Sequence, residues 1–470
     1  MPQKISIPSR KFTSVDSVAF ATLSGDFNPL HVDQLTARRT VAGGLVVHGI
    51  HLLLWALDQW SANHDGHFAI SNLNVSFSRP VLVGVEVSLA LSKEVDYQCS
   101  MVLFAAGVEV ATISLGVIEE NDTFVPLPGS SPPLNACNDL SAADLPGRRG
   151  NLSIHYNSNA ISDLFPRISN TFPAVQLASL LASTRLVGVE CPGLHSLYSE
   201  INLIADSRAK LASLGYIVSS FDARFNLVTM LVEVPGMSGE IKAFLRPGPV
   251  RQPCCAYIRA WGVEPNAYAN QRALVVGGSR GLGEVIAKTL AMGGADVALT
   301  YYRGQDEADA VVADIFKNSG RAISLRLDVT AADCSASIGN WLPTHLYYMA
   351  TPHIVRGKRG VYSPDSFSIF CSYYVEGFAR LLSSINSPCL QYVYYPSSIF
   401  LDEQPLDMVD YISAKSAGEA LFRILQKANP TVRFVCSRLP RVQTDQSNSL
   451  IPVSSEAALP VVLNQLKLSY

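Results

Sequence analysis

Alternating apolar and polar residues dominate the chain between residues 68 and 119. Residues 70–77 and 85–91 place apolar side chains at nearly every second position, and Pro80 and Gly84 separate the two runs. A period of two is typical of strands with one buried and one solvated face, so this stretch predicts an antiparallel sheet. Residues 50–60, just upstream, are apolar nearly all round, which predicts a helix buried by that sheet.

A similar order of elements occurs a second time. An apolar helix is expected at 172–183, and strand-like runs follow at 215–222, 227–234 and 239–246. Helix followed by strands is the order of the first segment, so we expect a second copy of the same structural unit. Residues 121–150, rich in proline, glycine and serine, predict a linker between the two copies.

The pattern changes after residue 268, where continuous apolar strands alternate with helices. Strands without polar alternation are typical of a parallel sheet covered on both faces, so we expect a doubly wound α/β (Rossmann) domain. The expected strands are 273–276, 295–302, 324–329, 345–350, 391–396 and 432–438.

Composition limits the functional classes. The 470 residues are 48% hydrophobic and 16% charged, which is enough apolar material for several cores. A net charge of −3 gives no electrostatic case for nucleic acid or a membrane surface. There is no run of 18 apolar residues, no apolar signal region at the N-terminus, and no zinc spacing among the nine cysteines. We therefore expect a cytoplasmic protein with reduced thiols and no bound metal.

The loop from Ser24 to His31 carries candidate acid–base chemistry. Asp26 and His31 lie five residues apart among turn-forming residues, and Gly49 begins the buried helix. A carboxylate and an imidazole can share the two proton transfers that addition or removal of water requires. Asn28 is placed to orient Asp26 or the water, and the Gly49 N–H to stabilise charge on a carbonyl oxygen. The alternative is structural, because Asp and Asn commonly form turns and a lone His can be a core residue.

The run Ser-Gly-Asp-Phe-Asn-Pro-Leu-His closely resembles the motif of MaoC-like, (R)-specific enoyl-thioester hydratases. The resemblance covers about the first 120 residues and implies a hot-dog fold. It also implies that Asp26 and His31 are the catalytic pair and that Gly49 is an oxyanion donor. We expect His48 and His51 to have packing roles.

The second copy lacks a matching Asp-to-His run before its helix. The stretch at 158–163 has no histidine in the corresponding place, so we expect this half to be non-catalytic and to wall the acyl tunnel of a double hot dog. Cys191 and His195 flank a Pro-Gly turn, and no third group is present to orient them as a catalytic pair.

A glycine-rich turn opens the third segment. The first expected strand runs into residues 277–283, where glycines allow a tight turn and the approach of a pyrophosphate to a helix N-terminus. The second strand ends without an acidic residue to bind a ribose hydroxyl, whereas Arg280 and Arg303 can pair a 2′-phosphate, so we expect NADPH rather than NADH. The alternative is that both arginines are solvated. The expected nucleotide-binding residues are Gly277, Ser279, Arg280, Gly281, Leu282, Gly283, Arg303, Asp328 and Val329.

Tyr411 and Lys415, four residues apart, share one helical face, and Ser398 precedes them at a strand end. A nearby ammonium lowers the pKa of a phenol and suits it to proton exchange with a carbonyl or alcohol. With the glycine loop, the set resembles the short-chain dehydrogenase/reductase family over about 200 residues. The resemblance implies that Tyr411 is the acid, Lys415 binds ribose, Ser398 orients the carbonyl and Thr444 contacts the nicotinamide. The sequence departs from the family pattern at Val276, at 348–351 and at Tyr374, the place of the tetrad asparagine.

Taken together, the sequence predicts a hot-dog domain at 1–125, a second hot-dog half at 148–250 and a reductase domain at 268–470. We expect reduction of a 3-oxoacyl thioester with NADPH and dehydration of the (3R)-hydroxy product to the trans-2-enoyl thioester. Acyl carrier protein is the expected carrier and coenzyme A the alternative, in a homo-oligomer, dimer or tetramer. Three other functions stay open: a coenzyme A-linked hydratase/dehydrogenase of acyl breakdown, a hydratase with a weakly reducing nucleotide domain, and a non-catalytic scaffold.

Overall fold

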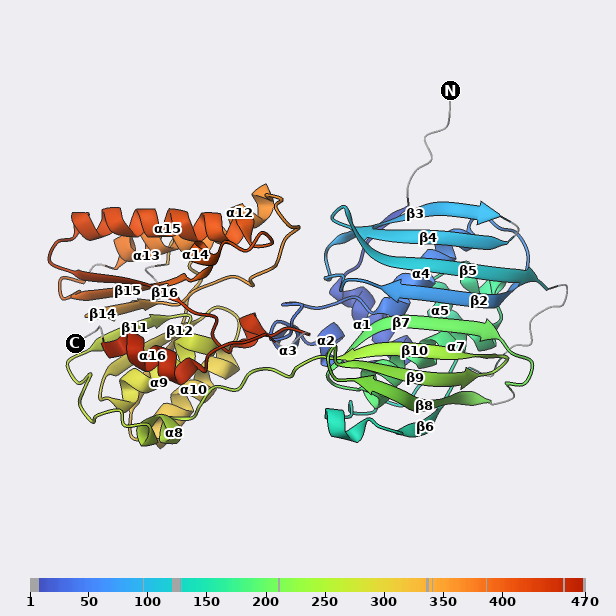
Figure 1. Cartoon of the computed structure of the whole chain (residues 1–470), viewed down its shortest axis with the longest axis horizontal. Helices are drawn as coiled ribbons and strands as arrows, with labels where there is room; N and C mark the ends of the chain where they lie inside the picture. The colour runs from blue at the N-terminus through green and yellow to red at the C-terminus, as the bar shows by residue number, and fades with distance from the viewer. Residues whose placement is uncertain are drawn as a thin grey trace, which may run out of the picture. The chain divides into compact units, whose positions relative to one another are not determined.

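The computed structural model describes residues 8–95, 97–120, 127, 129–209, 212–334, 338–339, 341–385, 387–450 and 453–467. The chain forms two compact units (Figure 1), Met1–Gly248 with Ser449–Pro452, and Pro249–Asn448 with Val453–Tyr470. The N-terminal residues 1–7, which we expected to lack a signal region, lie outside the described residues. So do 121–126 and 128 of the expected linker.

The first unit is built on one ten-stranded antiparallel sheet with an internal repeat. Its strand order is β1-β3-β4-β5-β2 followed by β7-β10-β9-β8-β6, so each half presents the same order outward from the β2–β7 junction. The strands are β1 (Ser9–Lys11), β2 (Phe68–Phe77), β3 (Glu86–Val95), β4 (Gln98–Ala105), β5 (Val108–Glu119), β6 (Arg149–Ser153), β7 (Ser196–Ala205), β8 (Ser213–Asp222), β9 (Leu227–Val234) and β10 (Met237–Leu245).

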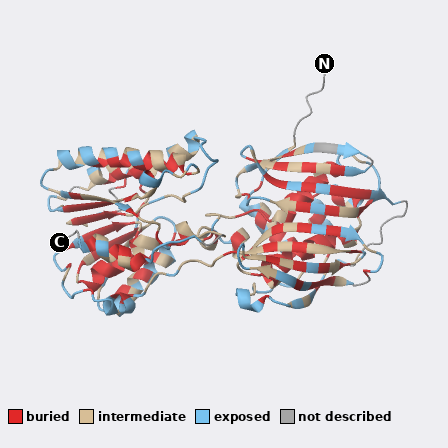
Figure 2. Cartoon of the chain, in the orientation of Figure 1, coloured by how far each residue is buried: buried red, intermediate tan, exposed pale blue. Residues whose placement is uncertain are grey.

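One long buried helix lies in each half of this unit. Helix α4 (Gly49–Ser61) and helix α7 (Ala174–Arg185) are buried along almost their whole length, and the inward faces of the strands cover them (Figure 2). This is the double hot-dog arrangement that the repeat predicted. The shorter helices are α1 (Ser14–Ser24), α2 (Pro29–Val32), α3 (Gln34–Ala37), α5 (Ser158–Leu164) and α6 (Ile168–Thr171).

Strand β7 was not among the expected strands, and neither were the short edge strands β1 and β6. The buried Ser199 of β7 weakens the apolar alternation, yet β7 pairs with both β2 and β10 at the centre of the sheet. Residues 200–204 of β7 pair with a strand on each side, so main-chain hydrogen bonding supports the strand at this point.

The second unit contains a six-stranded parallel sheet with the order β13-β12-β11-β14-β15-β16. Helices cover both faces, α9 (Gly281–Met292) and α10 (Gln305–Lys317) on one side and α13 (Phe378–Ser384) and α15 (Val409–Ala428) on the other (Figure 1). This confirms the predicted Rossmann architecture. The strands are β11 (Arg272–Val276), β12 (Asp296–Tyr301), β13 (Arg321–Arg326), β14 (His345–Tyr348), β15 (Tyr392–Ser398) and β16 (Arg433–Leu439).

Strand β13 and helix α8 are two places where this unit differs from the sequence prediction. Strand β13 starts three residues earlier than expected, because its register with β12 aligns Arg321 with Asp296. Helix α8 (Cys255–Ala260) lies between the second and third predicted domains, and it buries Cys255 and Ile258 in the core of the second unit.

Two further features accord with the sequence. Over the described part of the chain, no helix combines the length and the apolarity needed to cross a bilayer. All nine cysteines are described, and each is a free thiol.

Candidate active sites

The catalytic loop of the first unit is shaped by local backbone chemistry. Helix α1 ends at Gly25, whose φ of +78° is a left-handed conformation that favours glycine. Asn28 then caps α2, its side-chain oxygen accepting from the Leu30 N–H at 3.0 Å, and Pro29 occupies the first helical position. Asp26 therefore lies in the short connection between two helices, and His31 on the second of them.

The Asp26 carboxylate is enclosed and held at both oxygens. Its residue is 1% exposed; Thr184 Oγ1 donates to Oδ2 at 2.7 Å, and the Asn28 main-chain N–H donates to Oδ1 at 3.2 Å. Burial raises the pKa of Asp26 above its usual value, while the positive charge of protonated His31 and the Thr184 hydrogen bond oppose that rise. The carboxyl group is therefore better able to carry a proton than a solvent-exposed aspartate.

His31 has a defined tautomer. Its Nδ1 lies 2.7 Å from the Val46 carbonyl oxygen, and since that oxygen only accepts, Nδ1 carries the proton. The Nε2 atom of the neutral ring is then left with its lone pair. Burial lowers the pKa of His31, so the ring stays neutral at neutral pH and can accept a proton.

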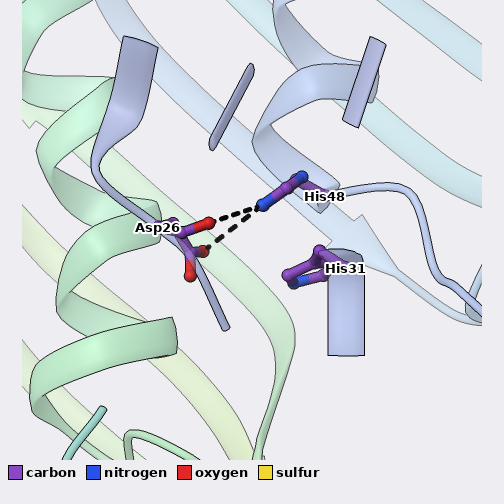
Figure 3. A group of neighbouring side chains, drawn as sticks. All are labelled: Asp26, His31 and His48. Carbon is purple, nitrogen blue, oxygen red and sulfur yellow. Dashed lines mark hydrogen bonds and ion pairs between the residues drawn. The ribbon is translucent and has the colours of Figure 1, made fainter. Parts of the chain in front are cut away.

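His48 completes the cluster, although the sequence suggested only a packing role. Its ring stacks on the His31 ring with centroids 3.7 Å apart, and its Nε2 donates to the Asp26 main-chain oxygen at 3.0 Å. Figure 3 shows this ring nitrogen directed at Asp26, whose Oδ2 lies 4.0 Å from it. In the sequence, the feature that could have pointed to His48 is its position directly before Gly49. His51, one turn further on, packs face to face against Phe20 with centroids 4.6 Å apart.

The same three side chains present ligand atoms within 4.8 Å of one another, a spacing that can hold a metal ion. The hydrogen-bonded nitrogens of His31 and His48, however, each carry a proton. The two rings also lie within 24° of parallel, so their in-plane lone pairs do not converge on one point. The arrangement fits a proton-transfer cluster better than a metal centre.

The second hot-dog half contributes directly to this site. Thr184 belongs to α7, and Gly188 follows in the π-helical turn η2 (Leu186–Glu190). A Cβ atom on Gly188 would lie 2.1 Å from Asp26 Oδ1, so only glycine leaves room for the carboxylate. We predicted a non-catalytic wall here, and the structure places a hydrogen-bond donor and a steric support against Asp26.

The Asn28 side chain is committed to holding loops together. Its Nδ2 donates to the carbonyl oxygens of Gly188 at 2.8 Å and Gly193 at 3.1 Å, and its residue is 1% exposed. We predicted that Asn28 orients Asp26. The contact with Asp26 is made by the main-chain N–H of Asn28 and not by its side-chain amide. Gly49 opens α4, so its N–H has no helical acceptor, and a Cβ there would meet the Phe77 ring at 3.0 Å.

The glycine loop of the second unit connects β11 to α9 at the carboxyl edge of the sheet. Gly277 has a φ of +79° and donates its N–H to Thr300 Oγ1 at 3.0 Å. A Cβ on Gly283 would lie 2.1 Å from the Gly277 carbonyl oxygen, so a glycine at 283 allows the helix to pack on the turn. Ser279 and Leu282 lie between these glycines, and Thr444 follows β16 with its methyl group 3.7 Å from the Cβ position of Gly281.

The charged residues expected to bind the nucleotide contact other residues of the chain in this structure. Arg280 Nη1 lies 3.7 Å from Asp445 Oδ2, and the guanidinium of Arg303 lies 5.2 Å from the centroid of the Tyr302 ring. Asp328 Oδ1 accepts from the Thr330 main-chain N–H and hydroxyl, so this carboxylate caps its own turn. Val329, expected beside the adenine, is buried.

Tyr411 and Lys415 share a face of α15 and are both buried, as the spacing predicted. Burial raises the pKa of Tyr411 to about 12, against the opposing hydrogen bond with Ser398. Burial lowers the pKa of Lys415 to about 7, and its Nζ donates to the Pro396 carbonyl oxygen at 2.8 Å. We expected the ammonium to lower the pKa of Tyr411, and that expectation is wrong for this structure, because burial dominates for both groups.

Family models match one stretch in each unit of the chain. Residues 2–112 match the model of the MaoC like domain, and residues 271–342 match that of the short chain dehydrogenase. A 3-oxoacyl-[acyl-carrier-protein] reductase of Synechocystis is 45% identical over 67 residues, or 14% of this chain and 27% of the relative. Versicolorin reductase stcU of Emericella nidulans is 34% identical over 103 residues, or 20% and 38%. The chain therefore spans only about a quarter to two fifths of these relatives.

Solved structures are also similar to part of the chain. A short chain dehydrogenase from Burkholderia cenocepacia in complex with NADP is 23% identical, covering 43% of this chain and 91% of that chain, with a TM-score of 0.38. The angucycline C-6 ketoreductase LanV with bound NADP is 18% identical, covering 44% and 90%, with a TM-score of 0.39.

Proposed function

Because the chain carries a MaoC-like domain at its N-terminus and a short-chain dehydrogenase domain at its C-terminus, we propose that it is a bifunctional acyl-thioester enzyme. One site reduces a 3-oxoacyl thioester with NADPH, and the other removes water from the (3R)-hydroxyacyl product. The observation that carries the proposal is the buried Asp26 carboxyl beside the unprotonated Nε2 of His31, next to the N-terminus of α4.

Dehydration needs a base at C2 of the acyl chain and an acid at the 3-hydroxyl. His31 Nε2 takes the C2 proton, and the Asp26 carboxyl gives its proton to the leaving hydroxyl, so that water and the 2-enoyl thioester result. The unpaired N–H of Gly49 stabilises negative charge on the thioester oxygen. Hydration follows the same steps in reverse.

Reduction needs a hydride donor and a proton donor. The glycine loop would hold NADPH, which when bound would supply a hydride to C3. The Tyr411 phenol gives its proton to the oxygen that becomes the 3-hydroxyl. Ser398 holds that oxygen, and Lys415 binds the ribose. Because the product of this step is the substrate of dehydration, the two activities form a sequence. The synthetic direction favours acyl carrier protein as the thioester handle.

One observation favours a second candidate, a coenzyme A-linked enoyl hydratase/3-hydroxyacyl dehydrogenase that uses NAD. The ion pair between Arg280 and Asp445 engages one of the two arginines proposed to bind a 2′-phosphate. With Arg280 neutralised, the preference for NADPH depends on Arg303.

The test is to supply the acetoacetyl thioester on acyl carrier protein and on coenzyme A, each with NADPH and with NADH. Nicotinamide absorbance follows reduction, and the mass of the acyl product reports loss of water. We expect NADPH oxidation and a crotonyl product on the carrier protein. Preference for NADH and coenzyme A would establish the second candidate, and no turnover of any combination would contradict both.

A further inference from the structure

Lys415 of the second unit is enclosed by aromatic rings. Its residue is 7% exposed, and its Nζ lies 4.0 Å from the centroid of the Tyr374 ring and 5.1 Å from that of the Tyr395 ring. Among the described residues, the Pro396 carbonyl oxygen is the one hydrogen-bond acceptor recorded for this amine. When the amine is protonated, one of its three N–H groups therefore has an acceptor among the described residues, and the Tyr374 ring lies at cation–π distance.

The Tyr374 ring is fixed over Lys415 from several directions. Its hydroxyl is hydrogen-bonded to Thr351 Oγ1 at 2.6 Å, and its main-chain oxygen accepts from the Tyr395 hydroxyl at 3.0 Å. Its ring stacks on Phe370, with centroids 6.0 Å apart. The residue lies in the π-helical segment η3 (Ser372–Gly377) and is 1% exposed. A π-helical turn re-aims side chains relative to an α-helix and is frequent at functional sites.

We propose that Tyr374 competes with the bound nucleotide for Lys415, so that removing its aromatic face strengthens nucleotide binding. This inference rests on the proposed function, in which Lys415 donates to ribose hydroxyls. Those hydroxyls need the N–H groups that now face aromatic rings. Binding must therefore break the ammonium–ring contact, and the nucleotide affinity is reduced by the free energy of that contact.

The position and chemistry of Tyr374 make it a positioning residue that acts through Lys415. Its hydroxyl is directed to Thr351 rather than to the ammonium, so the ring and not the hydroxyl contacts Lys415. A phenylalanine at this position keeps the aromatic face and loses only the hydroxyl. Leucine or methionine at this position removes the aromatic face and still fills much of the space with apolar atoms.

The experiment is fluorescence titration of NADPH into the full chain and three variants. We expect Tyr374→Leu to bind NADPH about 3- to 30-fold more tightly than the unaltered chain, and Tyr374→Phe to bind with nearly unchanged affinity. Phe370→Leu, which removes a neighbouring ring without an Lys415 contact, should not tighten binding. Thermal unfolding verifies that each chain is folded, and Tyr374→Met repeats the test if the leucine variant fails to fold.

Tighter binding is informative because a merely structural role for Tyr374 predicts equal or weaker binding after its removal. If the unaltered chain reduces acetoacetyl thioester and Tyr374→Leu binds NADPH no more tightly, this inference is overturned while the proposed function stands. If the leucine variant binds more tightly and no chain reduces a thioester, the reductase proposal fails and the competition stands. If no chain binds NADPH or NADH, both are overturned.

Discussion

Thr184 donates a 2.7 Å hydrogen bond to Oδ2 of Asp26 across 158 residues of chain, from the second hot-dog half to the first. Both residues are buried, Thr184 at 3% and Asp26 at 1% exposure. The half without a catalytic pair thus sets the orientation and the proton affinity of the carboxyl group in the other. The second half therefore supports the site of the first through Thr184.

Loss of the Thr184 hydroxyl is expected to slow the hydratase. A hydrogen bond to a charged group contributes about 1.5–3 kcal/mol, so Thr184→Val should lower kcat/KM for crotonyl thioester hydration by about tenfold or more. The same bond lowers the pKa of Asp26, so the limb of the pH profile that reports Asp26 should move to higher pH in the variant. Thr184→Ser, which keeps the hydroxyl, should retain most activity. An unshifted pH profile in Thr184→Val would rule out the role in proton affinity.

Gly188→Ala tests the steric support. The added methyl group would lie 2.1 Å from Asp26 Oδ1, so the carboxylate or the π-helical turn must move. A displacement of about 1 Å in a catalytic group can cost about 100-fold in rate, and we expect a loss of that order in hydration with NADPH binding unaffected. Gly129→Ala is the matched control, because nothing lies within 4 Å of its Cβ position. Full activity in Gly188→Ala would show that the site tolerates the shift.

His51 should make the first unit sensitive to acid. Burial lowers its pKa from 6.5 to about 3, so the unfolded chain binds a proton more readily than the folded one between these values. The stability that the neutral His51 ring contributes is therefore fully present above pH 6.5, and it declines as the pH falls toward 3. At about 1.4 kcal/mol per pH unit, protonation of His51 in the unfolded chain lowers the free energy of unfolding by about 2 kcal/mol at pH 5.

His51→Phe should accordingly raise the free energy of unfolding relative to the unaltered chain by more at pH 5 than at pH 7. Neither ring nitrogen of His51 has a hydrogen-bond partner among the described residues, and Phe20 stacks on its face, so an aromatic hydrocarbon suits the site. Urea unfolding at both pH values measures the difference, with the exposed His67→Gln as control. Equal shifts at pH 5 and pH 7 would contradict the linkage.

The nucleotide preference should depend on Arg303 more than on Arg280. Arg280 is 3.7 Å from the Asp445 carboxylate, whereas the recorded contact of Arg303 is with the face of Tyr302. Arg303→Ala is expected to weaken NADPH binding about tenfold and to leave NADH binding almost unchanged, because only the former carries a 2′-phosphate. Arg321→Ala, at the amino end of β13, is the control. Equal weakening for both nucleotides would remove Arg303 from the 2′-phosphate site.

Much of this molecule follows from local sequence pattern. The apolar content of residues 50–60 predicted the buried helix, and the alternation at 70–77 predicted a strand with one buried face, because periodicity reflects which face is buried. The glycine loop at 277–283 was predictable because its residues must adopt backbone shapes or close approaches that other residues resist.

Contacts between distant segments could not be predicted in the same way. Thr184 and Gly188 reach Asp26 only because the two halves share one sheet, and no local pattern in the chain marks that pairing. The position of Tyr374 over Lys415 depends on a π-helical turn, which a helical period does not reveal. The raised pKa of Tyr411 arises from burial that the Tyr-to-Lys spacing does not encode.

The proposed function has two sites that act independently in one chain, and a crossed pair of variants distinguishes them. Asp26→Asn and Tyr411→Phe are each assayed for hydration of crotonyl thioester and for NADPH oxidation with acetoacetyl thioester. We predict that Asp26→Asn loses hydration by 100-fold or more, roughly the contribution of general acid–base catalysis, and keeps reduction, and that Tyr411→Phe does the reverse. Loss of both activities in either variant, or undiminished hydration in Asp26→Asn, would contradict the account.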